Sequence, residues 1–171
     1  MNNTAILLAT SREKGNTKAL VNSVVDKTDS SFFNLKDYNF SPYDYEHKNT
    51  GDDFLPLILD LLKHDHLVFA TPVYWYSMSA QMKVFFDRLS DLLHVKKYLG
   101  RQLRKKHCSI ISTGASLEPE RCFEETFIHS FKYLGMNYQG MLYCYCEDSF
   151  DENIHKKSID HYIQDTLLKT I

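Results

Sequence analysis

Short apolar runs and amphipathic helical stretches alternate along the whole chain of 171 residues. The apolar runs, which are typical of strands covered on both faces, lie at residues 5–9, 31–35, 66–70, 108–112 and 137–146. Stretches with apolar residues at helical spacing follow each run, at residues 16–25, 54–62, 80–93, 123–134 and 154–167. This alternation predicts an α/β fold in which helices cover both faces of a parallel sheet.

Five strands joined by helical crossovers suit a doubly wound sheet with strand order 2-1-3-4-5, because such crossovers are almost always right-handed. In this topology the chain reverses its direction of growth between strands one and three, and ligands bind at the carboxyl ends of those strands. The length favours a single domain over residues 1–171, and no repeat or linker interrupts it. We therefore expect a ligand site in the loops that follow the first and third strands.

The composition excludes several classes of protein. A net charge of −2 and a pI near 6.4 argue against a nucleic-acid binder, and the basic segment 96–106 is expected to be a solvated connection. No apolar run reaches the ~20 residues that span a bilayer, and no basic segment precedes an apolar one at the N-terminus. We expect a cytoplasmic chain without a membrane partner or signal peptide. Buried free thiols are expected at Cys108, Cys122, Cys144 and Cys146.

The loop after the first strand, residues 10–17, has the chemistry to bind a phosphate. Its hydroxyl and amide donors are Ser11, Thr17 and Asn16, and Arg12 or Lys14 can add positive charge. Gly15 permits close backbone approach, and Asn16 is expected to cap a helix whose first N–H groups attract anions. The loop lacks both the Walker ending and the dinucleotide fingerprint. The alternative is a plain strand-to-helix turn.

The loop after the third strand carries a proline and three aromatic residues, which suits a flat heterocycle. Its residues are Pro72, Val73, Tyr74, Trp75, Tyr76 and Ser77. Aromatic planes can stack on a ring, and backbone N–H groups in such a turn can point at ring nitrogen and oxygen atoms. The alternative is that Tyr74 and Trp75 are core or interface residues.

A third loop, residues 112–116, follows the fourth strand. Thr113 and Gly114 supply a hydroxyl and a small residue that can close over the far edge of a ring. An ordinary turn, with Pro119 in the first turn of the next helix, is an equally good interpretation.

At these residues the chain resembles the flavodoxin-like NAD(P)H-dependent oxidoreductases, the NADPH-dependent FMN reductases. Residues 11–17 are similar to the phosphate loop of that family, and residues 71–88 to its ring loop and following helix. The resemblance implies bound FMN, a homodimer, and hydride transfer from NAD(P)H to a small acceptor such as a quinone, a nitro compound or free flavin.

Carried over by position, Ser11, Asn16 and Thr17 would hold the phosphate and residues 72–76 would line the ring. Tyr76 departs from the family pattern, because many relatives have glycine or another small residue there, and this bears on access to the ring. The helix residues Lys83, Asp87 and Arg88 are interpreted as structural or interfacial.

No metal site is expected. Some relatives hold an iron–sulfur cluster on cysteines after the second strand, but residues 42–47 contain no cysteine. Cys144 and Cys146 share one strand face and suggest core packing. His64 and His66 lack identifiable further ligands.

An enzyme of this kind needs no protein nucleophile or acid–base pair, because the flavin performs the hydride chemistry. We therefore assign no catalytic residue. Two other functions stay open: a flavodoxin-type electron carrier, and a non-catalytic binding module that kept the fold. The sequence leaves open the acceptor and the choice between NADH and NADPH.

Overall fold

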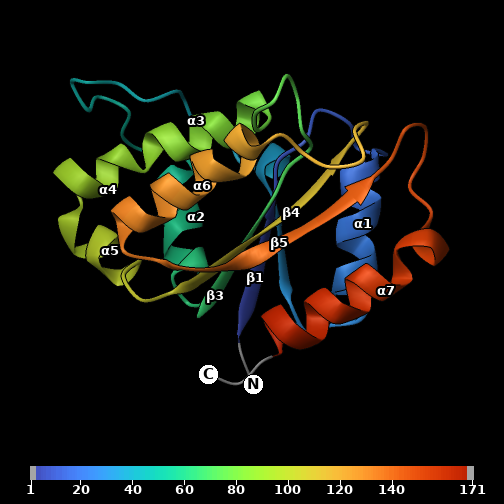
Figure 1. Ribbon diagram of the computed structural model, residues 1–171. Coiled ribbons are helices and arrows are strands. Elements are labelled where there is room, and N and C mark those ends of the chain that lie inside the picture. Colours follow the sequence, from blue (N-terminus) through green and yellow to red (C-terminus); the bar gives the residue numbers. More distant parts are fainter. Residues whose placement is uncertain (1–2, 169–171) are drawn as a thin grey trace.

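The computed structural model describes residues 3–168, which form one five-stranded parallel sheet with strand order β2-β1-β3-β4-β5 (Figure 1). The strands are β1 Thr4–Leu8, β2 Ser31–Asn34, β3 His66–Ala70, β4 His107–Gly114 and β5 Asn137–Tyr145. The order and the parallel pairing confirm the predicted flavodoxin-like doubly wound sheet.

Helices cover both faces of the sheet. They are α1 Asn16–Val25, α2 Phe54–Leu61, α3 Ala80–Arg88, α4 Ser90–His94, α5 Lys97–Gln102, α6 Arg121–Leu134 and α7 Glu152–Tyr162, with a short 3₁₀ turn at Leu35–Asp37 and a π turn at Ile163–Leu167. Figure 1 shows α1 and α7 on one face and α2 to α6 on the other. Within the described residues, no helix is both long and apolar enough to cross a membrane.

Each strand shares its side chains between two cores, which explains the continuous apolar runs in the sequence. Ile6 and Leu8 of β1 pack under α1 and α7, whereas Ala5 and Leu7 face the larger core beneath α2 to α6. Burial on both faces replaces the apolar–polar alternation of a solvent-exposed sheet.

The predicted helix at residues 80–93 is broken in two. The N–H of Leu89 bonds the carbonyls of both Phe85 and Phe86, at 3.2 and 3.1 Å, and α4 begins at the next residue. This shared bond tightens the last turn of α3 and ends its regular ladder.

The prediction of a solvated connection at residues 96–106 is wrong in part, because α5 lies within it. Leu99 and Leu103 are buried in the larger core. Gly100 permits the contact between α5 and α4: a Cβ at this position would lie 2.5 Å from the carbonyl oxygen of Leu92. The glycine is therefore required by close helix packing rather than by a turn.

Three smaller expectations are also corrected. Strand β4 extends to Gly114, because its last residues pair with β5. Pro119 precedes the N-cap residue Glu120 and does not lie in the first turn of α6. Cys122 is exposed, whereas the other three cysteines are buried, and all four are free thiols.

Arg88 fastens the long segment between β2 and α2 to the helical layer. Its guanidinium is 1% exposed, donates to Asp52 at 2.5 Å and to Asp91 at 2.8 Å, and also donates to the carbonyl of Ser41 at 2.8 Å. It lies 4.6 Å from the ring centroid of Phe54. Burial alone would raise the pKa of Asp52, but hydrogen bonds, chiefly from Arg88, outweigh it and lower that pKa.

Replacement of Arg88 by methionine is expected to destabilise the fold by about 3 kcal/mol or more, since it leaves Asp52 without its cationic partner and Asp91 with His47 alone in a partly buried site. The matched control is Lys83→Met on the same helix, which breaks an exposed pair with Asp87 and is expected to cost less than about 1 kcal/mol. Urea unfolding measures both. Equal losses in the two variants would contradict the assigned role.

Because the pKa of Asp52 is lowered in the folded state, its pairing energy is present above the unfolded value of ~3.9 and is lost as the pH falls below it. The stability of Arg88→Met is therefore expected to depend less on pH than the stability of the original chain in acid. Unfolding curves between neutral pH and about pH 3 provide the measurement.

Candidate functional site

The loops after β1 and β3 meet at the carboxyl edge of the sheet, as the topology predicts. The amide of Ala9 donates to the carbonyl of Ala70 at 2.9 Å, and the hydroxyl of Ser79 donates to the carbonyl of Ala9 at 2.9 Å. The side-chain amide of Gln81 reaches the Ser11 hydroxyl at 3.4 Å. The start of α3 thereby lies against the phosphate loop.

Gly15, not Asn16, is the N-cap of α1, so the predicted cap is corrected. The backbone of Gly15 is extended, with φ −96° and ψ 165°, and Asn16 is the first helical residue. The side chain of Asn16 turns away to hold the segment after β5: it donates to the carbonyl of Asp148 at 3.3 Å and accepts from the amide of Phe150 at 3.1 Å. The first N–H groups of α1 have no acceptor within the helix, which leaves them available to an anion.

The remaining phosphate-loop side chains divide into exposed donors and a buried support. Ser11 and Arg12 are exposed. Glu13 forms an ion pair with Lys36 at 2.6 Å, and the hydrogen bond and charge of this lysine lower the pKa of the glutamate. The loop's one carboxylate is thus neutralised by a cation from outside the loop.

Thr17 joins the phosphate loop to the end of β4. Its hydroxyl lies 2.7 Å from the hydroxyl of Thr113, and both side chains are buried. Thr113 belongs to the strand rather than to the third loop, where the sequence placed it. A hydroxyl pair without charge therefore lies at the junction of the first loop and the fourth strand.

Position 114 requires a glycine because the side chain of Tyr143 lies across it. A Cβ on Gly114 would lie 2.6 Å from the Tyr143 hydroxyl, which donates to the carbonyl of Ser116 at 2.7 Å. This contact holds the loop after β4, residues 115–120, over the adjacent strand. Tyr143 was not a candidate from sequence, because nothing in the local pattern links it to a glycine in a different strand.

Hydrogen bonds fix both ends of the ring loop. The amide of Val73 donates to the carbonyl of Thr113 at 2.9 Å, and Pro72 is buried. The amide of Ser79 donates to the Thr71 hydroxyl at 3.0 Å, and the Ser79 hydroxyl accepts from Met82 at the start of α3. Sequence reasoning missed Thr71 and Ser79, although a serine immediately before a helical pattern is a capping signal.

The tip of the ring loop is a tight turn with unusual backbone angles. Tyr74 and Ser77 exchange two backbone hydrogen bonds, at 2.9 and 3.0 Å. The two central residues, Trp75 and Tyr76, have φ of 48° and 63°, as in the turns that join hairpin strands and favour Asn-Gly. Their side chains are 92% and 61% exposed. The strained turn therefore carries two large aromatic side chains that lie outside the core.

A hollow of about 600 Å³ adjoins the phosphate loop on the side of α1. Its lining includes Lys14, Asn16, Lys18 and Phe150, together with Glu13, which is paired with Lys36. Two cations beside free helix N–H groups make this edge of the sheet suitable for a negatively charged ligand.

Comparison with known proteins agrees with this geometry. The NADPH-dependent FMN reductase family matches the chain over residues 2–146. A Bacillus subtilis protein named as an NAD(P)H-dependent FMN-containing oxidoreductase, YwqN, is 30% identical over 146 residues, which cover 80% of this chain and 81% of that protein.

Solved structures share the fold. The Trp repressor binding protein from Bacillus subtilis has a TM-score of 0.74 and 24% identity, and the match covers 95% of this chain and 98% of that one. An NADPH-quinone reductase from P. pentosaceus has a TM-score of 0.71 and 16% identity, with 96% and 98% covered.

Replacement of Tyr76 by glycine is expected to stabilise the chain by about 0.5–1 kcal/mol, because glycine adopts positive φ without the steric cost paid by other residues. The exposed tyrosine ring contributes little packing in return. Tyr76→Ala is the matched control: it removes the ring but keeps a Cβ, so no gain is expected. Thermal unfolding of the three proteins compares them, and an equal gain in both variants would show that the ring, not the backbone, is the destabilising element.

Proposed function

Because the chain belongs to the NADPH-dependent FMN reductase family, we propose that it passes a hydride from NAD(P)H through FMN to a small acceptor such as a quinone, a nitro compound or free flavin. FMN when bound supplies the hydride chemistry itself, so the protein has to bind, orient and shield. The observation that carries the proposal is the meeting of the phosphate loop and the ring loop at one edge of the sheet.

We assign the phosphate of FMN to the first loop. The backbone N–H groups of Asn16 and Thr17 start α1 and have no acceptor inside the helix, and the helix dipole favours an anion there. Ser11 and Arg12 are exposed and add a hydroxyl and a guanidinium. The Asn16 side chain is occupied by Asp148 and Phe150, so its role in binding is to hold the loop in place.

The flavin ring is assigned to the loop after β3. Pro72, Val73 and Tyr74 form the base of this loop, and the amide of Val73 is held by β4. The turn at Trp75 and Tyr76 offers backbone N–H groups that suit ring nitrogen and oxygen atoms. Ser77 closes the turn through its two bonds with Tyr74.

Thr113 and Gly114 complete the proposed site from β4. Thr113, at the end of β4, holds Thr17 in place through the hydrogen bond between their hydroxyl groups. Gly114 is crossed by Tyr143, and this contact fixes the start of the loop that would border the far edge of the ring. These residues position the first and third loops relative to each other.

A homodimer is part of the proposal. Large apolar side chains are exposed on the loops after β3 and β4: Trp75 is 92% exposed and Leu117 is 79% exposed. Exposed apolar side chains gathered at a binding edge are typical of interaction surfaces. A second copy of the chain would cover them and restrict water at the ring.

The visible spectrum of the protein with FMN is the primary test. We expect a yellow protein whose flavin absorption is lost when NADH or NADPH is added without oxygen and returns when a quinone is added. Steady oxidation of NAD(P)H with the quinone would distinguish the enzyme from an electron carrier, which requires a separate reductase. A protein that does not take up FMN would overturn the proposal.

The phosphate assignment predicts a change in preference between FMN and riboflavin. In the double variant Ser11→Ala/Arg12→Gln the affinity for FMN is expected to fall tenfold or more, because hydrogen bonds to a charged group contribute ~1.5–3 kcal/mol each. Riboflavin lacks the phosphate, so its weaker binding should be unchanged. The control variant is Ser130→Ala/Lys132→Gln. Both of these residues belong to α6 and lie outside the phosphate loop. Flavin fluorescence titration gives the affinities, and a parallel loss for both ligands would count against the assignment.

A further inference from the structure

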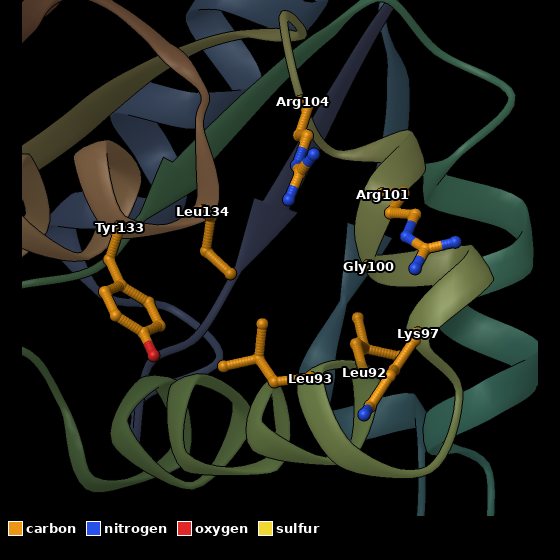
Figure 2. A pocket seen from close by; sticks show the side chains of 8 residues that line it. All are labelled: Leu92, Leu93, Lys97, Gly100, Arg101, Arg104, Tyr133 and Leu134. Atoms are coloured by element: carbon orange, nitrogen blue, oxygen red, sulfur yellow. The ribbon is translucent and has the colours of Figure 1, made fainter.

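A second concave site lies at the opposite, amino edge of the sheet, where α4, α5 and the end of α6 come together. It encloses about 250 Å³ and is shown in Figure 2. Helix α6 ends there, just before β5, and α5 ends there, just before β4. The pocket therefore lies where the parallel strands begin, whereas the loops assigned to FMN lie where the strands end.

One wall of the pocket is apolar. Leu92 and Leu134 are buried, and Leu93 is half-buried beside them. Tyr133 is 78% exposed, and its ring borders the pocket on the side of α6. In Figure 2 these side chains surround a common space.

The other wall is positively charged. Lys97 and Arg101 come from α5, and Arg104 comes from the segment that follows it. Figure 2 shows the Arg104 guanidinium extending toward the space bordered by Leu93 and Leu134, whereas Lys97 ends near Leu92 and the Arg101 guanidinium points outward from α5.

These three cations have no acidic partner among residues 3–168: the ion pairs of the described chain involve other residues, such as Arg88 with Asp52 and Lys83 with Asp87. The sequence explains the imbalance. Residues 92–117 contain six Lys or Arg and no Asp or Glu, in a chain whose net charge is −2. The pocket therefore combines uncompensated positive charge with an apolar wall.

The backbone around the pocket is fixed by close packing. Gly100 lies against the carbonyl of Leu92, where a Cβ has no space. Gly135 ends α6 with φ 74°, and a Cβ on it would lie 3.1 Å from Cγ of Arg104. The side chain of Arg104 thus runs along the end of α6. The part of it nearest the backbone is held in place without a ligand.

We propose that this pocket binds a small aromatic anion, with a carboxylate or phosphate against Arg104 and a ring against Leu93 and Tyr133, while Lys97 adds positive charge at the edge of the pocket. Arginine pairs with both anions through parallel N–H bonds. The volume corresponds to about eight water molecules at ~30 Å³ each, which suits one ring with one anionic group. A nucleic acid or a long acyl chain does not fit this size.

The test is a titration of the FMN-loaded protein with benzoate and with phenyl phosphate, followed by ¹H–¹⁵N NMR. FMN occupies the phosphate loop, so an anion cannot bind there. We expect saturable shifts confined to the amides of residues 97–104 and 133–135. Tighter binding of benzoate or of phenyl phosphate would identify the preferred anionic group.

Two simpler probes separate the contributions of charge and ring. Benzyl alcohol keeps the ring without the charge, and inorganic phosphate keeps the charge without the ring. Both are expected to bind at least tenfold more weakly than the aromatic anions. Phosphate that binds as tightly as phenyl phosphate would overturn the proposal, because the apolar wall would then contribute nothing.

Variants on the two walls complete the experiment. Lys97→Gln/Arg104→Gln is expected to weaken benzoate binding at least tenfold, and Tyr133→Ser to weaken benzoate but not phosphate. The charge-matched control is Lys156→Gln/Lys157→Gln on α7, where affinity should stay within twofold. All substituted side chains are exposed, and the flavin spectrum checks that each variant is folded. Chemical shifts that do not saturate would contradict the proposal. An equal loss of benzoate affinity in the pocket variant and in the control would do the same, because both results indicate only a solvated basic surface.

Discussion

The parallel pairing of β1 with both β2 and β3 is the constraint on which the rest of the structure depends. Ile6 of β1 lies between Phe32 of β2 and Val68 of β3. The chain reaches β2 through α1 on one face, and reaches β3 through α2 on the other. The loops that leave β1 and β3 therefore start side by side but lead to helices on opposite faces. The space between them is a consequence of the topology, before any side chain is considered.

Strain in the ring loop is maintained by the bonds at its base. Trp75 and Tyr76 adopt positive φ in the nine-residue segment 71–79 between β3 and α3. The amides of Val73 and Ser79 are bonded to β4 and to Thr71, so neither end of the loop can move to relax the turn. Backbone strain persists where the surrounding structure determines the conformation, and such sites are often functional.

The strands and the meeting of the two loops were predictable from sequence because buried strands carry continuous apolar runs. Features that depend on distant partners were not. Ser-Thr-Gly at the end of β4 has the composition of a turn, yet Thr113 pairs with Cys144 and Gly114 with Tyr145, so tertiary pairing extends the strand. Gly100 has the composition of a helix breaker and instead allows α5 to pack on α4.

Arg88 illustrates the same limit, since its partner Asp52 lies 36 residues away in a segment without regular structure. The side chain of Asn16 had the right chemistry for a ligand, but its NH₂ group already donates to the carbonyl of Asp148, and its oxygen accepts from the amide of Phe150, 134 residues away. Local pattern gives residue type and spacing; it does not tell which of several available donors is already used inside the protein. Assignment of individual site residues therefore needed the three-dimensional contacts.

The two ends of α6 show why the two edges of the sheet need different chemistry to attract an anion. Helix N-termini at the carboxyl edge present free N–H groups and positive dipole ends, so a phosphate can be held there largely by neutral donors. At the amino edge α6 ends, and its carbonyls oppose an anion. Any anion there has to be held by side-chain cations. The concentration of Lys97, Arg101 and Arg104 around Tyr133 and Leu134 meets that requirement, whereas the phosphate loop carries a glutamate neutralised by Lys36.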